Sequence, residues 1–600
     1  MKPTAEILAK ISINSNANKE EIFTRLYRYL LRPDIYHIAY KNLYSNSGAA
    51  TKGVNNDTAD GFSEAKIAKI IQSLTDETYQ PSPVRRTHIK KQNGKMRPLG
   101  IPTFTDKLIQ EVLRMILEAV YEPVFWDCSH GFRPNRSCHT ALRSLKKNFN
   151  GARWFVEGDI KGCFDNIDHA VLVGLLNGKI KDARIIKLIY KFLKAGYMEN
   201  WQYHNTYSGT PQGGIISPLL ANIYLHELDE FVMKLKNEFD KPRERATTPE
   251  HNELRVKAAK IRRHIDKSEG EERQQLLKEL KETRATMHKT PCTSQTDKVI
   301  KYIRYADDFL IGVKGSREDC TWIKSKLSEF IGNTLKMELS EDKTLITHSS
   351  ESARFLGYDI NVRRSGEIKR GGSGGKFNVT KRTLNNHTQL VIPLNDKIHK
   401  FIFSKGIAIQ KKDGTLFPVH RNSLLKLTDL EIVTAYNAEL RGICNYYGMA
   451  SNYHKLKYFV YLMKYSCLKT LAAKHKSTIS KIVEKFKDGR GGWGIPYETK
   501  NGKKRCYFAN YADCKGSTGA TDVIKDVARM HNQSVTPLEM RLKAKTCELC
   551  GTAESDHYEI HHVNKLKNLK GKQPWEIVMI AKRRKTLIVC RKCHKEIHNQ

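Results

Sequence analysis

Ile303–Val313, with the sequence IRYADDFLIGV, is the stretch that decides the fold of this chain. Two short runs of β-forming residues flank a pair of adjacent carboxylates, which predicts a β-hairpin with Asp307 and Asp308 at its turn. Because burying two acids without a partner is costly, we expect a cation to face them. Mg²⁺ is the natural candidate, since it prefers carboxylate and phosphate oxygens. An Asp-Asp pair by itself is more often a simple turn, so the prediction needs support from elsewhere in the chain.

Phe155–Asp165, with the sequence FVEGDIKGCFD, provides that support. An apolar strand ends at Asp159, a turn follows, and Phe164 comes five residues later. Enzymes that transfer phosphoryl groups with two metal ions hold those ions about 4 Å apart with carboxylates from separate strands. One ion activates the attacking hydroxyl and the other the leaving pyrophosphate. Asp159 together with Asp307 and Asp308 would supply such a set.

The two stretches resemble the palm motifs of reverse transcriptases, and further blocks of that family follow in its order. The form Tyr-Ala-Asp-Asp-Phe at 305–309 is similar to that of retroelements of bacterial origin. The other blocks are Lys95–Pro102 for the fingers strand that contacts the incoming triphosphate, Gly209–Gly214 for the Pro-Gln-Gly loop, Leu339–Thr344 for the last palm block and Phe355–Tyr358 for the primer-side strand. Together these blocks imply an RNA-directed DNA polymerase.

The resemblance also implies a role for each matching residue. The Mg²⁺ ligands of the polymerase, two ions in all, would be Asp159, Asp307, Asp308 and the backbone of Ile160, and the three aspartates would be catalytic. The dNTP substrate would be bound by Lys95, Arg97, Phe164 and Gln212. Phe164 would lie beneath the sugar, where its ring excludes a 2′-hydroxyl. Core packing is its alternative role, and both can hold together; for Lys95 and Arg97 the alternative is a solvated loop.

Arg441–Tyr447, with the sequence RGICNYY, lies on a helix-prone stretch beyond these blocks. It resembles the maturase region of group II intron-encoded proteins, where the thumb also binds intron RNA. The resemblance implies RNA contacts by Arg441, Asn445, Tyr446 and Tyr447. Aromatic rings beside cations suit unpaired RNA, because they offer base stacking together with phosphate pairing. Without the resemblance, Tyr446 and Tyr447 are better interpreted as half-buried packing residues.

Two Cys-x₂-Cys pairs, Cys547 with Cys550 and Cys590 with Cys593, stand 39 residues apart near the end of the sequence. The chain has 13 cysteines and no apolar signal core at its start, which favours reduced thiols over disulfides. Two such pairs predict a tetrahedral structural zinc site, on which a small module would depend for folding.

His561, His562, His594 and His598 lie near these cysteines and need another role, since one tetrahedral zinc is already full. His594 and His598 are four residues apart, hence on one helical face. The module resembles the ββα-metal fold of HNH endonucleases, which implies His562 as general base and His561, His594 and His598 as ligands of one divalent ion. It departs from that family at Arg584–Thr586, where an Asn is usual. The alternative is a zinc module that only binds DNA.

The charge of the chain fits a nucleic-acid partner. There are 103 Lys and Arg against 64 Asp and Glu, a formal net charge of +39. Such a surface attracts polyanions strongly, although a solubility face or an anionic membrane would also account for it. No apolar stretch approaches the roughly 20 residues that span a bilayer. We therefore expect an intracellular protein without a signal peptide, in the bacterial cytoplasm.

The expected fold class is multidomain α/β. It comprises a right-hand polymerase with an α+β palm sheet, a helical thumb and a zinc-stabilised ββα-metal module. The expected domains are an N-terminal fingers extension (1–80), fingers and palm (81–385) with a charged helical insert at about 240–292, the thumb or maturase domain (386–485), a DNA-binding segment (486–540) assigned from domain order, and the HNH endonuclease (541–600).

The resemblance covers the whole chain and is strongest to the lactococcal type of group II intron-encoded protein. It implies three activities: RNA-directed DNA polymerisation, promotion of intron splicing, and nicking of a DNA strand that then primes reverse transcription during intron mobility. The implied partners are group II intron RNA, a double-stranded DNA target and a DNA primer, with a homodimer as a possibility. One rival is a splicing cofactor that no longer polymerises, which the intact acids disfavour. Another is a bacterial reverse transcriptase unrelated to splicing, which would not be expected to carry both the maturase-like thumb and the HNH module.

Overall fold

The computed structural model describes residues 3–46, 48–90, 94, 96–200, 202–210, 213–241, 247–290, 292, 297–365, 368–372, 378–382, 385–488, 492–499, 502–515 and 537–599. The N-terminal part is helical. Its helices are α1 (Thr4–Ala17), α2 (Pro33–Tyr44) and α3 (Glu64–Thr75), and α1 and α2 pack on α4 (Phe104–Tyr121). Pro33 occupies the first turn of α2, where its missing N–H costs nothing, and the Ser63 side chain caps α3 by accepting a hydrogen bond from the Lys66 N–H.

The fingers sheet follows this helical region. It contains β1 (Val84–Lys90), β2 (Met96–Ile101), β4 (Tyr197–Glu199) and β5 (Gln202–His204), in the order β2-β1-β4-β5. Strands β1 and β2 are antiparallel and pair from Arg85 opposite Ile101 to Lys90 opposite Met96.

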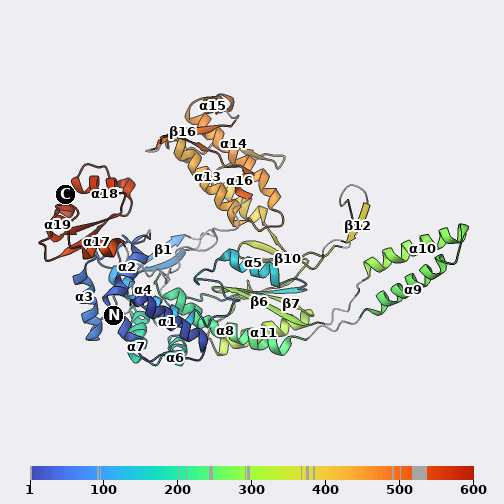
Figure 1. Ribbon diagram of the computed structural model, residues 1–600, viewed down its shortest axis with the longest axis horizontal. Helices are drawn as coiled ribbons and strands as arrows, with labels where there is room; N and C mark the ends of the chain where they lie inside the picture. Colours follow the sequence, from blue (N-terminus) through green and yellow to red (C-terminus); the bar gives the residue numbers. More distant parts are fainter. Residues whose placement is uncertain are drawn as a thin grey trace.

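The palm sheet lies at the centre of the molecule, with α5 and α8 on its two sides (Figure 1). It contains β3 (Trp154–Asp159), β6 (Val299–Tyr305), β7 (Asp308–Lys314) and β8 (Ile346–His348), in the order β6-β7-β3-β8. The helices around it are α5 (Cys138–Asn148), α6 (His169–Lys179), α7 (Ala183–Lys194), α8 (Ser217–Phe239) and α11 (Arg317–Asn333).

Alternate residues of the palm strands belong to two different hydrophobic cores. Val156 and Ile311 pack into a core shared with the fingers, whereas their neighbours Phe155 and Leu310 pack into a core shared with the thumb. This is the alternation expected of a strand that is buried on both faces, because successive side chains point to opposite sides. The palm sheet therefore joins the two halves of the polymerase.

Two long helices, α9 (Pro249–Ile265) and α10 (Gly270–Lys289), form a hairpin that projects away from the palm (Figure 1). They enclose a small core of their own, made of Ala258, Ile261, Ile265 and Leu280. The other surfaces of the hairpin are charged and exposed, as its composition of Glu, Lys, Arg and Gln favours.

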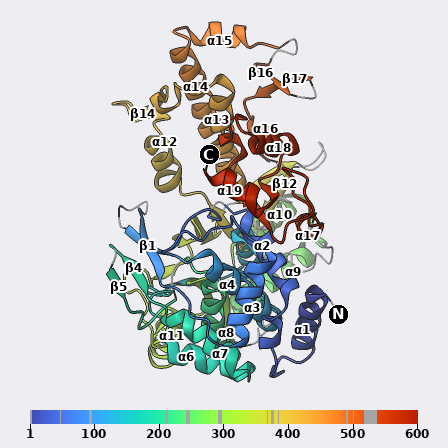
Figure 2. The ribbon, with the colours of Figure 1, turned by 90° about the vertical axis from the view of Figure 1, so that its left-hand side faces the viewer.

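Between the palm sheet and the thumb helices lies a three-stranded sheet of β9 (Ala353–Phe355), β10 (Tyr358–Val362) and β13 (Thr388–Val391), and β11 (Ile368–Gly372) pairs with β12 (Asn378–Arg382). The thumb elements that follow are α12 (Lys400–Ser404), β14 (Ala408–Gln410), β15 (Leu416–Pro418), α13 (Asp429–Tyr446), α14 (Leu456–Lys474) and α15 (Ile479–Lys485). After the thumb come β16 (Gly494–Thr499), β17 (Gly502–Tyr507) and α16 (Tyr511–Lys515). Figure 2 shows the thumb helices standing above the palm.

The C-terminal module is small and returns to the N-terminal helices. It contains α17 (Pro537–Lys543), β18 (Tyr558–His562), α18 (Pro574–Lys582), β19 (Thr586–Cys590) and α19 (Arg591–Asn599), with β18 and β19 antiparallel. A backbone bridge joins Phe62 to Ile560, and Figures 1 and 2 place the module beside α2. The predicted fold class, a right-hand polymerase with a helical thumb and a ββα module, is confirmed. No helix in the described part of the chain is long and apolar enough to cross a membrane.

Candidate active sites

The predicted carboxylate pair lies at the turn of the β6–β7 hairpin. Tyr305 pairs with Asp308, so Ala306 and Asp307 form a two-residue turn. Ala306 has a φ of +56°, a conformation that L-residues adopt at a cost and that often marks functional sites. The Arg304 Nη1 donates a hydrogen bond to the Ala306 carbonyl at 3.0 Å, which holds the turn in this conformation.

Asp159 meets this turn at the end of the neighbouring strand. It stands in register opposite Asp308, and Gly158 stands opposite Phe309. A Cβ atom on Gly158 would lie 2.0 Å from the Phe309 ring, so only glycine allows the ring to cover the strand at this point. The sequence therefore brings two strands together so that their terminal carboxylates share one site.

The electrostatics of the three aspartates favour a cation between them. Asp308 is exposed at the mouth of the site, but the protein around it displaces much of its water. This desolvation, together with the charges of Asp307 and Asp159, raises the pKa of Asp308 to about 7. Partial burial and the Asp159 charge also raise the pKa of Asp307, while Arg97 and Lys343 oppose that shift. Like charges that raise one another's pKa in this way fit a divalent cation, which would stabilise the ionised forms.

Lys343 supplies a positive charge at the site. Its Nζ donates a hydrogen bond to Asp159 Oδ2 at 2.7 Å, from the predicted last palm block. That hydrogen bond is the main cause of a raised pKa of Lys343. Lys343 thus partly offsets the charge that a metal ion would neutralise.

Of the remaining residues predicted for the polymerase site, the structure describes Arg97, Ile160 and Phe164. Arg97 is exposed on β2, and Ile160 is buried directly after Asp159. Phe164 is half-buried, and its ring stands edge-on to Phe132 at 6.1 Å between centroids. The Thr210 N–H donates to the Phe164 carbonyl at 2.7 Å, which fixes the start of the Pro-Gln-Gly loop beside it. Lys95 and Gln212 lie outside the described residues.

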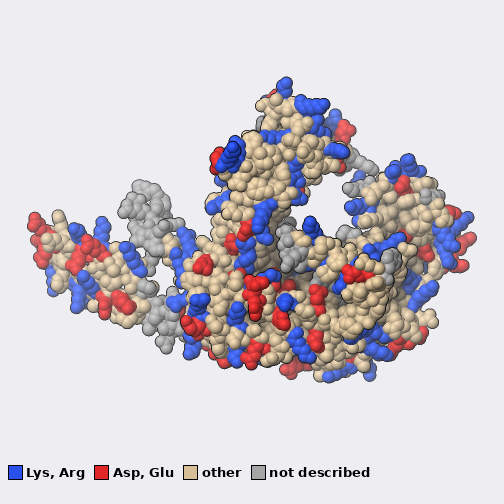
Figure 3. All heavy atoms as spheres, turned by 180° about the vertical axis from the view of Figure 1, so that it is seen from behind, with Lys and Arg blue, Asp and Glu red and all other residues tan. Residues whose placement is uncertain are grey.

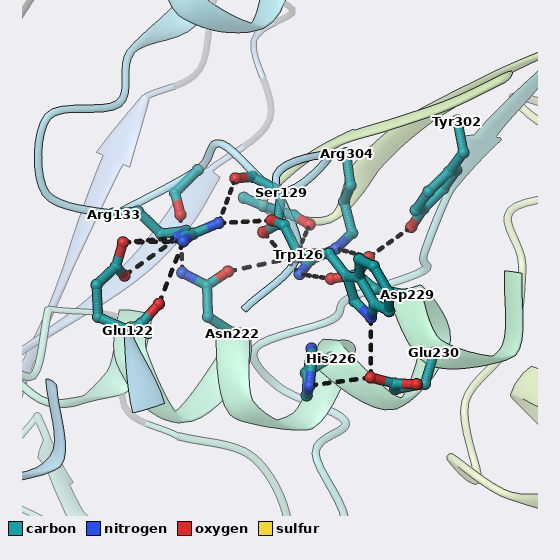
Figure 4. Close-up of polar contacts among 12 residues, drawn as sticks. Glu122, Trp126, Ser129, Arg133, Asn222, His226, Asp229, Glu230, Tyr302 and Arg304 are labelled. Carbon is teal, nitrogen blue, oxygen red and sulfur yellow. Dashed lines mark hydrogen bonds and ion pairs between the residues drawn. The ribbon is translucent and has the colours of Figure 1, made fainter. Parts of the chain in front are cut away.

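A buried arginine beneath the turn was not anticipated from the sequence. Arg304 is fully buried and forms an ion pair with Asp229 of α8, with N–O distances of 2.6 and 2.7 Å. Figure 4 shows Tyr302 and Asn222 converging on the same pair. The Tyr302 hydroxyl donates to Asp229 Oδ1 at 2.8 Å, and Arg304 Nη1 donates to Asn222 Oδ1 at 3.2 Å. The signal available in the sequence was Arg304 itself, a charged residue in a β-forming run three residues before Asp307.

The residues predicted to contact RNA lie at the end of α13. Arg441 is exposed and Asn445 is half-buried. The Tyr446 hydroxyl donates to the Leu356 carbonyl at 2.5 Å, and the Tyr447 hydroxyl donates to the Gly357 carbonyl at 3.2 Å. Both tyrosines thus join the thumb to the palm. These contacts are the ones expected if the two residues serve in packing.

The four predicted zinc ligands converge in the C-terminal module. Four Sγ atoms all lie within 4.8 Å of one another there, those of Cys547, Cys550, Cys590 and Cys593. Burial raises the pKa of the Cys547 thiol, but backbone N–H groups of the two cysteine turns outweigh it and lower this pKa to about 7. A readily formed thiolate and four sulfurs in a compact cluster fit a tetrahedral zinc ion.

The predicted histidines form a second cluster in the same module, and it contains one unexpected member. His561 comes from β18, and His594 and His598 from α19. Asp60, from the loop between α2 and α3, completes a set of four ligand atoms within 4.8 Å of one another. Nothing in the sequence pointed to Asp60, because it precedes the histidines by about 500 residues. Among the described residues, two groups of His, Cys, Asp or Glu side chains converge closely enough to hold a metal ion: this set and the four cysteines.

A carboxylate behind this cluster orients His594. Glu559 contacts the Nδ1 of His594, which leaves the Nε2 of His594 facing Asp60. A carboxylate behind a histidine is the usual way to fix the tautomer and orientation of a metal ligand. Thr586, within the stretch Arg584–Thr586 where HNH sequences usually carry an Asn, stands in register opposite His562.

Comparison with known proteins finds three families along the chain. Residues 89–240 match the family described as reverse transcriptase (RNA-dependent DNA polymerase), residues 385–534 match type II intron maturase, and residues 547–594 match AI2M/AI1M-like HNH endonuclease. The chain thus joins a reverse transcriptase to a maturase and an endonuclease.

Relatives that match almost all of this chain identify the family. The group II intron-encoded protein LtrA of Lactococcus lactis subsp. cremoris is 66% identical over 100% of this chain and 99% of its own length. An uncharacterised 91 kDa protein in the cob intron of Schizosaccharomyces pombe is 36% identical over 95% of this chain and 69% of its own. A Candida tropicalis telomerase structure matches 52% of this chain and 61% of its own with 15% identity and a TM-score of 0.29, too low to carry an argument.

The chain belongs to the group II intron-encoded proteins. It is a multifunctional enzyme with reverse transcriptase, maturase and HNH endonuclease domains, as predicted, and its maturase domain implies that it binds intron RNA. Families of both enzyme types generally use divalent metal ions.

Proposed function

We propose that Asp159, Asp307 and Asp308 are the catalytic ligands of the polymerase and, with the Ile160 backbone, hold two Mg²⁺ ions. The observation that carries this proposal is the register of Asp159 opposite Asp308, with Asp307 at the adjoining turn. When bound, such ions activate the attacking 3′-hydroxyl and stabilise the leaving pyrophosphate. Lys343 helps to orient Asp159, and the Arg304–Asp229 pair fixes the turn that carries Asp307.

The deoxynucleotide would bind between the fingers and the palm. A cavity of about 320 Å³ lies there, and its lining includes Arg86, Gly100, Asp165 and Thr210. Phe164 lies one residue before Asp165, a position from which its ring can exclude a 2′-hydroxyl. Arg97, already close enough to lower the pKa of Asp307, is placed to pair with the triphosphate. Lys95 and Gln212 complete the proposed nucleotide site.

The test is extension of a DNA primer on an RNA template by the Asp307→Ala variant. We expect Mg²⁺-dependent extension to be lost, because the remaining carboxylates cannot hold both ions. The matched control is Asp266→Ala, at the exposed end of α9, which should extend as the wild type does. Retained extension by Asp307→Ala would refute the site.

For the endonuclease, we propose His562 as the general base and His561, His594 and His598 as ligands of one divalent ion. The cysteine cluster holds structural zinc. Cleavage of one strand of a DNA target would leave a 3′-hydroxyl, which the polymerase then extends on the intron RNA. This sequence of events requires the DNA target and primer as partners besides the RNA. A homodimer stays a prediction.

The endonuclease assignment is tested with His594→Ala. We expect nicking of the DNA target to be lost while primer extension is retained, because His594 lies in the module and far along the chain from the palm. His288→Ala, on the exposed last turn of α10, serves as the matched control. Nicking at the wild-type rate by His594→Ala would count against the ion site.

The domain boundaries given above also stand as a proposal: fingers extension to residue 80, fingers and palm to 385, thumb to 485, DNA-binding segment to 540 and endonuclease to 600.

Figure 3 shows a hollow between the thumb, the palm and the C-terminal module, with Lys and Arg side chains on the surfaces around it. Such a basic hollow suits a nucleic-acid duplex. Arg441, exposed at the end of α13, is the best placed of the four predicted RNA-binding residues to contact intron RNA.

A further inference from the structure

The loop between α2 and α3 is fastened to the endonuclease module by its backbone. The Gly61 N–H donates a hydrogen bond to the Ile560 carbonyl at 3.0 Å, and the Ile560 N–H donates to the Phe62 carbonyl at 2.9 Å. Phe62 is fully buried, and its ring stacks on Tyr40 with 4.1 Å between centroids. The position of Asp60, two residues before Phe62, is therefore set by a packed segment of the fingers extension.

From this segment the Asp60 carboxylate enters the histidine cluster. Asp60 Oδ2 lies 2.6 Å from His598 Nε2 and 3.2 Å from His594 Nε2, and Oδ1 lies 3.2 Å from His561 Nδ1. The two Nε2 atoms of His594 and His598 are themselves 3.3 Å apart. Ring nitrogens and a carboxylate oxygen that converge so closely have the composition of a site for a divalent cation such as Zn²⁺ or Mn²⁺.

The donor atoms of this cluster also fit a bound ion. His561 is buried, yet its Nδ1 forms no hydrogen bond of good geometry with any described residue, although it lies next to Asp60. The Nδ1 of His594 is occupied by Glu559, so its Nε2 is the atom left to bind a metal. An ion would give the converging nitrogens a common partner.

We propose that Asp60 is the fourth ligand of a divalent-cation site shared by the fingers extension and the endonuclease module, and that it occupies the position a DNA phosphate needs. The inference rests on the proposed ion ligands His561, His594 and His598. Catalytic sites of this kind bind their ion through three protein ligands and keep the next position open for water or substrate. A protein carboxylate in that position closes the site.

The fingers extension also covers the proposed general base. His562 is 8% exposed, its backbone N–H donates a hydrogen bond to Asp60 Oδ1 at 2.7 Å, and its ring Nε2 lies 3.1 Å from the Tyr44 carbonyl. The Tyr44 ring stands edge-on to the imidazole at 6.1 Å. The fingers extension therefore blocks access to both the ion and the general base. In this arrangement the module holds its ion but cannot cut DNA until the module separates from the fingers extension.

The test measures amide hydrogen exchange in peptides covering residues 59–63 and 558–562 of the full chain, with and without Mn²⁺. Mn²⁺ prefers oxygen and nitrogen ligands and should leave the cysteine site untouched. These amides exchange when the two segments separate, and, on the proposal, that separation also releases the ion. Mn²⁺ at ten times its dissociation constant should therefore slow exchange about tenfold. In Asp60→Asn this Mn²⁺-dependent slowing should disappear. Asn keeps an acceptor for the His562 N–H and removes only the charge.

The control is Asp76→Asn, the same substitution at an exposed residue after α3, which should slow exchange as the wild type does. Equal Mn²⁺-dependent slowing in Asp60→Asn, or none in the wild type, would overturn the shared site.

The second measurement is target nicking by the full chain bound to its intron RNA, with primer extension as a check on folding. We expect Asp60→Asn to nick at least as fast as the wild type; nicking lost as completely as in His594→Ala would make Asp60 part of the cutting machinery and overturn the closure. Nicking retained by His594→Ala would instead defeat the underlying ion site, whatever the exchange result.

Discussion

At the scale of single residues, the acidic turn joins a strained backbone to carboxylates with raised pKa values. The pKa of Asp308 is about 7 because of desolvation first, then the charges of Asp307 and Asp159. Below this pH the carboxyl holds a proton that a metal ion must displace, and above it the metal meets a free carboxylate. We therefore expect the Mg²⁺ concentration for half-maximal primer extension to rise up to about tenfold per pH unit below 7, and to be nearly constant between pH 7.5 and 8.5. Mg²⁺ titrations of extension rate at fixed pH values check this, and a requirement unchanged from pH 8 to 6 would contradict it.

The sequence predicted these carboxylates better than the residues that support them. Asp159, Asp307 and Asp308 could be found because each lies at or beside the end of a short β-forming run, and such runs are local patterns. Asp229 and Asp60 could not, because each acts across an interface with a partner distant in the chain. Tyr446 and Tyr447 show the converse difficulty, since an aromatic pair beside an arginine has the same local pattern whether it stacks on RNA or packs on the palm.

At the scale of elements, the hairpin β6–β7 depends on α8 through the Arg304–Asp229 pair. Both side chains are completely buried, and removing one partner of such a pair leaves an uncompensated charge that costs about 3–5 kcal/mol. We expect Asp229→Ala to lower the urea midpoint of the palm strongly and to reduce extension, because Arg304 also holds the Ala306 carbonyl. Glu329→Gln on α11, which removes an exposed ion pair with Lys326, should change the stability by about 0–1 kcal/mol. Equal midpoints for these two variants would show that the buried pair does not support the hairpin.

At the scale of the whole molecule, the net charge of +39 and the basic hollow imply that affinity for intron RNA is dominated by phosphate contacts. A protein that neutralises about six to ten phosphates loses about 10³–10⁵ in affinity between 50 and 200 mM salt. The order of the domains was readable from the sequence, because each carries its own motifs. How the C-terminal module packs on the fingers was not, because the contacting backbones of Phe62 and Ile560 carry no pattern that pairs them.

Arg441 allows a direct test of whether phosphate contacts dominate the affinity for intron RNA. Replacing an arginine that contacts phosphate should weaken RNA binding at every salt concentration and reduce the slope of log affinity against log salt by about one. We expect this of Arg441→Ala, measured by filter binding of the intron RNA from 50 to 400 mM KCl. Arg317→Ala, at the start of α11 beneath the palm, is the charge-matched control and should keep the wild-type slope. If Arg441→Ala also keeps that slope, Arg441 makes no phosphate contact, and the basic surfaces around the hollow must bind the RNA through other residues.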